Sequence, residues 1–152
     1  MHAEGYFVCL QILCLSESVT FTERCEEALK TSSLTNLILE MKKQLESYTS
    51  VDVQGANVLE LKLKALIMDT IHNIEVVEML SDLQVSAASD WKWQKQLRYY
   101  MARSGTGVMR MVDAEFNYTY EYQGNAPKLV HTPLTDKCYL TLTQGSCLQL
   151  VL

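Results

Sequence analysis

The chain has 152 residues, of which 48% are hydrophobic and 20% are charged, proportions typical of a globular domain with a buried core. Its 13 basic and 18 acidic residues leave a formal charge of -5, and no segment is strongly basic. This composition argues against disorder and indicates no nucleic-acid partner. The five cysteines have irregular spacing and no CxxC pair, which fits free or buried thiols better than a disulfide framework.

The first helix is predicted near the N-terminus. The one continuous apolar run, Tyr6–Leu15, is too short to span a bilayer and is interpreted as the buried start of a helix or as a strand. We therefore expect no membrane span. Thr20 and Glu23 have the spacing of a capping box, which predicts that a short helix begins there and continues to about Lys30.

Two longer amphipathic helices are predicted next. Ser32 or Ser33 is expected to cap the first, and Gly55 lies in the turn before the second, which runs from about Asn57 to Leu83. In both segments apolar residues recur at steps of three and four, the period of a helix with one buried face. The predicted apolar faces consist of Leu34, Leu37, Ile38, Met41, Leu45 and Tyr48, and of Leu59, Leu63, Leu66, Ile67, Ile71, Ile74 and Val77.

A fourth helix is predicted over Asp90–Ala102, with Ser89 or Asp90 as its cap. Aromatic residues alternate there with lysines, which could form a surface for stacking nucleic-acid bases. The acidic charge of the chain and the helical period favour core packing instead. The following Ser104–Gly107 lacks the lysine and the spacing of a phosphate-binding loop, and it is predicted to be a turn.

Beyond this turn the sequence changes to the two-residue period of a strand. The alternating aromatic residues are Phe116, Tyr118, Tyr120 and Tyr122. Val108–Val112 is the expected partner strand, joined to them through Asp113–Glu115. The sequence therefore predicts one small β-hairpin near residues 108–122.

The last element is predicted to be a short C-terminal helix. A turn is expected over Gln123–Pro127, followed by an extended segment up to Pro133. Thr132 or Thr135 is expected to cap a helix that continues to about Gln144, with Asp136 in its first turn, where the helix dipole favours an acidic residue. The predicted fold class is mainly α, a helical bundle with a small hairpin in the C-terminal third.

Candidate chemical sites are few. His72 has Asp69 and Glu75 three residues to either side, but one histidine with two carboxylates is a weak metal signal, and we interpret it as a polar helix face. No catalytic or metal-ligating residue is predicted, because HExxH and GxSxG motifs are absent. The extended apolar loop Leu129–Leu134, placed before a capped helix, could bind a flat aromatic ring through its backbone groups.

Several segments resemble dynein heavy chains. Tyr120–Gly124 followed by Lys128–Gln144 (KLVHTPLTDKCYLTLTQ) is similar to the segment leading into the first AAA+ module of that family, whose pattern is L-V-x-T-P-L-T-D-R/K-C-Y-x-T-L. Trp91–Tyr100 resembles the W-x-x-Q-L-R-Y-Y signature near the end of the family's linker. Phe21–Leu29 and Leu61–Ile74 are similar to the C-terminal helices of that linker. Within the family, the resemblance is greatest to the cytoplasmic dynein 2 class.

The resemblance covers about Gln11 to Gln144 and implies a domain organisation. Residues 11–103 would be the C-terminal helices of the linker, so that the bundle is of the linker type, and residues 104–144 would be the strand, loop and helix that lead into the first AAA+ module. Residues 1–10 and 145–152 do not resemble the family. The final GSCLQLVL stands where the family continues toward its phosphate-binding loop, so we expect a truncated isoform or a fragment of a gene model.

The resemblance also implies a function. The family hydrolyses ATP with Mg²⁺ to move toward microtubule minus ends, and the cytoplasmic dynein 2 class drives retrograde intraflagellar transport. Its members work with intermediate, light intermediate and light chains, and the expected location is the cytoplasm, the cytoskeleton and the cilium or axoneme. By resemblance, the adenine side of the ATP site would be lined by Leu129, Val130, Thr132, Pro133 and Leu134.

Without a phosphate-binding loop, we expect this chain to be catalytically inactive alone and to bind no nucleotide tightly. Two alternatives stay open. The chain could be a non-enzymatic helical interaction module that binds dynein subunits, or it could be a product that does not fold stably, because linker helices taken from a larger arch leave apolar faces uncovered.

Overall fold

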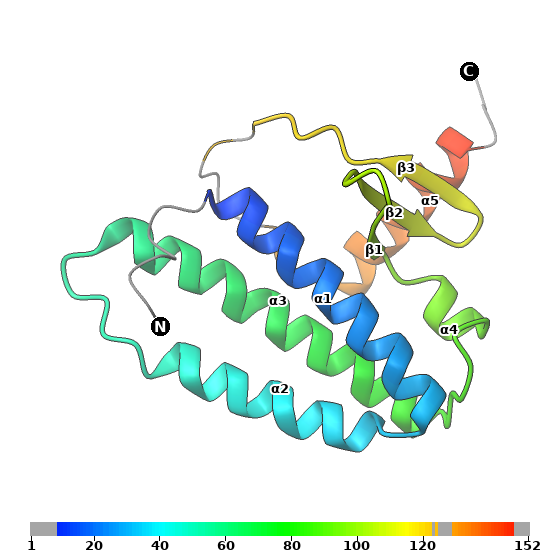
Figure 1. Cartoon of the computed structure of the whole chain (residues 1–152), viewed down its shortest axis with the longest axis horizontal. Helices are drawn as coiled ribbons and strands as arrows, with labels where there is room; N and C mark the ends of the chain where they lie inside the picture. Colours follow the sequence, from blue (N-terminus) through cyan, green and yellow to red (C-terminus); the bar gives the residue numbers. More distant parts are fainter. Residues whose placement is uncertain (1–8, 123, 125–128, 148–152) are drawn as a thin grey trace.

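The computed structural model describes residues 9–122, 124 and 129–147. Three long helices lie side by side in it (Figure 1): α1 (Leu10–Thr31), α2 (Leu34–Thr49) and α3 (Asn57–Asp82). A short helix α4 (Trp91–Gln94) leads to three antiparallel strands, β1 (Arg98–Met101), β2 (Gly107–Met111) and β3 (Ala114–Asn117), and to a last helix α5 (Pro133–Cys147). The fold is mainly α with a small antiparallel sheet, as the sequence predicts.

The main core lies between α1, α2 and α3, toward the tight turn that joins the first two helices. Ser32 has the left-handed conformation that ends α1, and Ser33 occupies the cap position of α2 without a capping bond from its side chain. The predicted apolar faces supply Leu34, Leu37, Met41, Ile74 and Val77 to this core. The prediction is wrong for Ile71, which is 43% exposed. The buried residues from all elements of the cluster are Cys25, Ala28, Leu29, Leu34, Leu37, Met41, Ile74, Val76, Val77, Leu80, Val85 and Trp93.

The predicted start of the first helix is wrong. Helix α1 begins at Leu10 and continues through Thr20, so Thr20 and Glu23 form no capping box. The physical reason is that nothing between Leu10 and Thr20 interrupts a helix: the segment contains neither proline nor glycine. The apolar run therefore belongs to the helix from Leu10 onward, and residues 6–8 lie outside the described part.

The predicted helix over Asp90–Ala102 is also wrong. Asp90 does cap α4, by accepting a bond from the backbone N–H of Lys92, but α4 ends at Gln94 and strand β1 begins at Arg98. The strand pairs with β2, and the N–H of Tyr99 donates to the buried hydroxyl of Thr22 on α1. These long-range partners outweigh the local helical spacing.

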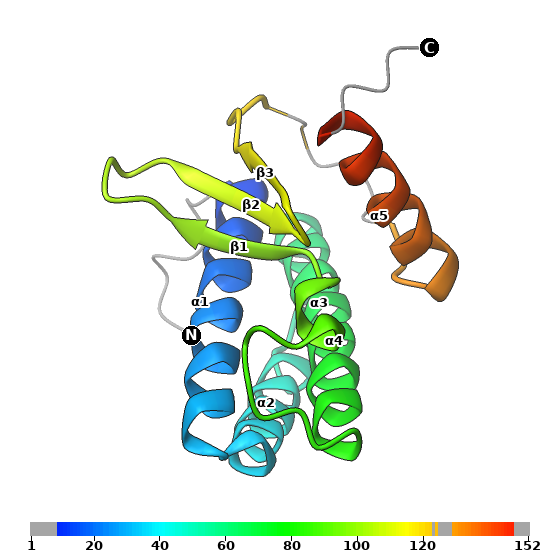
Figure 2. The ribbon, with the colours of Figure 1, turned by 90° about the vertical axis from the view of Figure 1, so that its right-hand side faces the viewer.

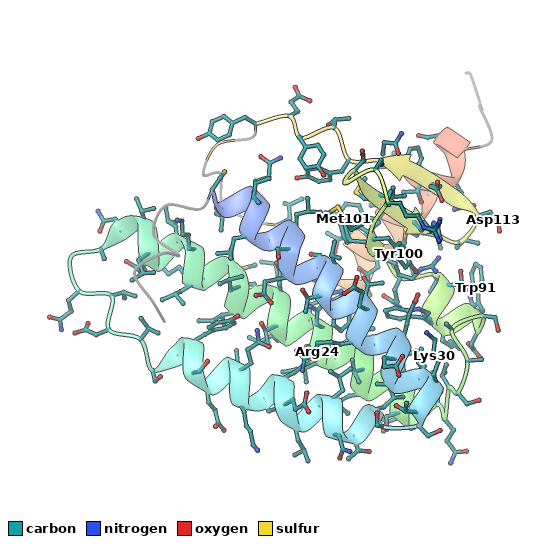
Figure 3. All side chains as sticks on the ribbon, in the orientation of Figure 1. Arg24, Lys30, Trp91, Tyr100, Met101 and Asp113 are labelled. Carbon is teal, nitrogen blue, oxygen red and sulfur yellow. The ribbon has the colours of Figure 1, made fainter. Side chains whose placement is uncertain are left out.

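The two tryptophans of α4 have opposite environments. Trp93 is fully buried and packs edge-on against Phe21, with 6.1 Å between ring centroids. Trp91 lies at the outer side of α4 (Figure 3) and is 54% exposed. Trp93, which lies between Lys92 and Lys95, is inside the core and cannot stack on a base. Core packing is therefore the correct interpretation of this residue.

The sheet contains one strand more than the predicted hairpin. Strand β2 pairs with both β1 and β3, and the connection to β3 is tighter than predicted: Val112 and Asp113 make the turn, while Glu115 already pairs with Arg110. Strand β3 ends at Asn117. Gln11 of α1 then donates to the hydroxyl of Tyr118 and to the carbonyl of Glu121, both at 2.8 Å, so the aromatic segment after β3 lies along α1 instead of extending the strand.

The sheet lies against α1, and α5 contacts strands β2 and β3 (Figure 2). The predicted Ser104–Gly107 turn is confirmed as the connection between β1 and β2, with Gly105 at a positive φ of 81°. Most of the predicted Gln123–Pro127 turn lies outside the described residues. Among the residues described, no helix has both the length and the hydropathy needed to cross a membrane.

Candidate functional site

The extended loop before α5 ends in a cap formed by the Thr-Pro-Leu-Thr sequence. Thr132 accepts a bond at its hydroxyl from the N–H of Thr135 (3.2 Å), and the N–H of Thr132 donates back to the hydroxyl of Thr135 (2.7 Å). This reciprocal arrangement is a capping box, and Pro133 at the first helical position needs no bonding partner for its nitrogen. The predicted cap at Thr132 and the acidic first turn at Asp136 are both confirmed.

The apolar residues of the predicted adenine side lie at the surface. Leu129, Val130 and Leu134 are 68%, 64% and 70% exposed. Three large apolar side chains this exposed within six residues are available to contact an apolar or aromatic partner. Thr132, by contrast, is engaged in the helix cap, so its hydroxyl already has a role in the local structure.

Two cavities adjoin this loop. One, of about 690 Å³, is lined by Leu129 together with residues of α1 and the sheet. The other, of about 350 Å³, is lined by Pro133 together with residues of α1, α3, β1 and α5. His131, Tyr99 and Tyr139 line both cavities, whereas Val130, Thr132 and Leu134 line neither. The structure therefore places the five predicted residues along one loop but not around one pocket.

His131 and His72 form a cluster that no pattern in the sequence indicates. Their rings are stacked, with 3.9 Å between centroids and an angle of 11° between planes. Asp136, in the first turn of α5, contributes a carboxylate, and the ligand atoms of these three side chains all lie within 4.8 Å of one another. Asp69 adds a second carboxylate, whose Oδ1 is 3.6 Å from Nε2 of His131.

The electrostatic setting of the cluster favours a neutral imidazole. Burial lowers the pKa of His72, and the neighbouring His131 lowers it further, against the opposing effect of Asp136, Glu75 and Asp69. The predicted polar face of α3 is therefore partly correct: His72 does lie near carboxylates, but it is half-buried beneath the loop. No local signal pairs His72 with His131, because the two residues come from distant parts of the sequence.

Residues 118–151 match the family model described as the hydrolytic ATP binding site of the dynein motor region. The chain is 60% identical over 143 residues to cytoplasmic dynein 2 heavy chain 1 of Tripneustes gratilla and 55% identical over 142 residues to that of Homo sapiens, in each case over 89% of this chain.

A more distant relative matches over nearly the same region. Dynein axonemal heavy chain 1 of Rattus norvegicus is 41% identical over 126 residues, which is 81% of this chain. The chain spans about 3% of the length of each of these relatives. The matched region therefore corresponds to one short segment of very long proteins.

Proposed function

Because the chain is homologous to one short segment of dynein heavy chains, we propose that it forms the junction between the linker and the first AAA+ module of a cytoplasmic dynein 2 heavy chain. Residues 11–103 supply the C-terminal linker helices, and residues 104–144 lead into the module. The observation that carries the proposal is 60% identity along most of the chain together with the separate match of residues 118–151 to a dynein ATP-site model.

The architecture supports this division. The part assigned to the linker contains the three long helices and their core. The part assigned to the module contains β2, β3 and α5, with the capped start of α5 directly after the exposed loop. Strand β1 belongs to the first part in sequence but pairs with β2 of the second, so the sheet joins the two parts.

The exposed loop is the proposed adenine side of the ATP site. Leu129 and Val130 present apolar surface before a helix start, and in the proposal they pack against the adenine ring with Thr132, Pro133 and Leu134. ATP with Mg²⁺ is the proposed cofactor of the complete motor. The 152 residues contain no glycine-rich loop with Lys-Thr, so the groups that hold β- and γ-phosphates and Mg²⁺ are not supplied by this chain.

A chimera tests the junction. Residues 11–144 replace the matching segment in the motor of the 60% identical heavy chain, and ATP hydrolysis is measured with and without microtubules. We expect turnover within a few-fold of the parent motor. A chimera that is folded, as judged by size exclusion and circular dichroism, but has lost ATP turnover would contradict the proposal.

The adenine side is tested within the same chimera. Leu129→Ser and Val130→Ser together are expected to raise the KM for ATP about tenfold or more, because apolar contact with the ring is lost. Leu142→Ser is the matched control, since Leu142 is equally exposed at 66% but lies in the body of α5. An equal KM in both variants would refute the assignment of the loop.

The chain on its own is proposed to be catalytically inactive. Phosphate release by the purified 152-residue chain is expected to equal a blank without protein, and EDTA is expected to have no effect. Phosphate release above the blank that EDTA abolishes would overturn this part of the proposal.

By homology, the proposed partners are the rest of the dynein complex, with its intermediate, light intermediate and light chains, and microtubules, which the full motor would contact. The proposed location is the cytoskeleton of the cilium.

A second candidate function rests on exposed apolar side chains of α2 and α3. The exposed side chains are Leu39 of α2 and, in α3, Val58, Leu61 and Ile71. They favour a helical interaction module that binds another dynein segment or subunit without catalysis. A pull-down with the purified subunits tests this candidate: binding that Leu61→Glu and Ile71→Glu abolish supports it, and no captured subunit refutes it.

A further inference from the structure

We propose that His72, His131 and Asp136, assisted by Asp69, form a binding site for one divalent transition-metal ion, with Zn²⁺ the best match. The site is independent of the proposed motor function, because it depends only on side chains within this chain. It would join the middle of α3 to the loop and first turn of α5.

The donor set fits zinc chemistry. Zinc sites in proteins take imidazole nitrogens and carboxylate oxygens, and many have three protein ligands with an open position for water. Here two imidazoles and one carboxylate offer ligand atoms within 4.8 Å of one another. Hard cations such as Mg²⁺ and Ca²⁺ prefer all-oxygen ligands, so two histidines select against them.

Asp69 supports the histidine ligands. Its side chain is only 12% exposed, and its Oδ1 lies 3.6 Å from Nε2 of His131. A carboxylate beside the second nitrogen of a ligating histidine orients the ring and raises its basicity, as in carboxylate–histidine–zinc sites.

The stacked rings set a limit on affinity. Two nearly parallel, stacked rings whose centroids are 3.9 Å apart cannot both have one ion in their planes, so at least one ring has to rotate before both lone pairs meet it. This reorganisation and the loss of the stack lower the affinity relative to a preformed site. Lys95 and Lys137 line the same cavity and oppose a cation, while the two carboxylates favour it. We therefore expect binding in the micromolar range.

The cavity gives the ion a route to the cluster. All four side chains line the 350 Å³ cavity between α3 and α5, which also admits water as a further ligand. The N-terminal end of α5 is held through its cap, so Asp136 keeps a defined position relative to His131.

Direct metal titration tests the site. ZnCl₂ is titrated into the 152-residue chain by calorimetry, and CoCl₂ is titrated with detection of the visible ligand-field bands that report four-coordinate Co²⁺. One ion per chain is expected to bind, and Zn²⁺ is expected to displace Co²⁺. Absence of saturable one-to-one binding of either ion up to about 0.1 mM would overturn the proposal.

Variants locate the ligands. His72→Ala and His131→Ala are each expected to weaken Zn²⁺ binding at least tenfold, and Asp136→Asn about tenfold. Because Asp136 lies in the first turn of α5 and does not belong to the main core cluster, D136N is expected to retain the fold even where a histidine variant does not. His2→Ala, which removes the remaining histidine, and alkylation of the cysteines are controls expected to change nothing. Unchanged affinity in D136N and in H131A, or loss of binding on alkylation, would refute the site.

Discussion

The carboxylate of Glu26 accepts a hydrogen bond at 2.6 Å from the hydroxyl of Tyr100, which joins the middle of α1 to strand β1. The same oxygen also accepts a bond at 3.3 Å from the indole nitrogen of Trp93. Tyr100 belongs to strand β1 of the sheet, and Figure 3 labels it beside α1. Glu26 thus fixes both α4 and β1 on α1, and both elements lie within the Asp90–Ala102 segment that the sequence predicts as one continuous helix.

Replacing Glu26 is expected to destabilise the chain. Glu26→Ala removes the acceptor of two side-chain bonds, one of them short and charge-assisted, and should lower the free energy of unfolding by about 1.5–3 kcal/mol. Urea denaturation measures the change. The neighbouring Glu27→Ala is the control, because Glu27 is exposed and has only a 3.8 Å ion pair with Lys30, so it should change stability by less than about 0.5 kcal/mol. Equal effects of both variants would contradict the role of Glu26.

The two tryptophans are expected to differ strongly in their contribution to stability. Trp93→Ala opens a cavity in the main core and should cost about 3–5 kcal/mol. Trp91→Ala removes a side chain that is more than half exposed and should cost less than about 1 kcal/mol. Thermal unfolding followed by circular dichroism gives the comparison. Similar melting temperatures for the two variants would show that the core is not packed around Trp93.

Gly107 is expected to tolerate no side chain. An added Cβ would lie 3.2 Å from Cβ of Tyr118 and 3.3 Å from the hydroxyl of Tyr120, and the glycine N–H donates to that hydroxyl. Gly107→Ala should therefore cost about 1–3 kcal/mol. Gly145→Ala is the opposite control: its Cβ would meet nothing within 4 Å, and it lies in α5, where alanine should stabilise the helix by about 0.5–1 kcal/mol. Denaturant midpoints that move in the same direction for both would contradict this prediction.

Alkaline pH is expected to destabilise the chain, in part through the protons of Cys25 and Tyr100. Burial raises the pKa of Cys25 from 9.0 to about 12, and burial with the bond to Glu26 raises that of Tyr100 from 10.0 to about 12. The folded chain holds both protons more tightly than the unfolded chain, so their stabilisation is complete below about pH 9 and is lost as the pH rises to about 12.

The free energy of unfolding should therefore fall over this pH range. Urea titrations at several pH values measure the slope. Cys25→Ala is expected to remove the part of this decrease in unfolding free energy that begins near pH 9. Tyr100→Phe is expected to remove the part that begins near pH 10. An unchanged slope in both variants would assign the alkaline transition to other groups.

The helix cap at Thr132 is expected to hold the start of α5. Thr132→Ala removes the acceptor for the N–H of Thr135 and should cost about 0.5–2 kcal/mol. Thr141→Ala removes a hydroxyl that bonds only to the carbonyl of Lys137 within the same helix, and it should be nearly neutral. Hydrogen exchange of the first turn of α5 reports the change locally: faster exchange in T132A than in T141A is expected, and equal exchange would exclude a capping role.

Elements whose signals are local could be predicted from the sequence. Gly55 and the apolar period predict α2 and α3, and the Thr132–Thr135 spacing with Pro133 predicts the start of α5, because capping involves neighbouring residues only. Strand β1 could not be predicted, because its stability depends on Thr22 and on β2, which are remote in sequence. The pairing of His72 with His131 was missed for the same reason.

Helix α5 is attached at its two ends to different parts of the molecule. Near its C-terminal end, the side chain of Gln144 donates to the carbonyl of Met111 at 2.8 Å, at the end of strand β2. Before its N-terminal end, His131 contacts Asp69 and His72 of α3. Any tilt of the sheet relative to the helical bundle must therefore lengthen one of these contacts. Helix α5 therefore couples the sheet to the helical bundle. A change in the angle between them would strain either the His72–His131 stack or the hydrogen bond from the Gln144 side chain to Met111.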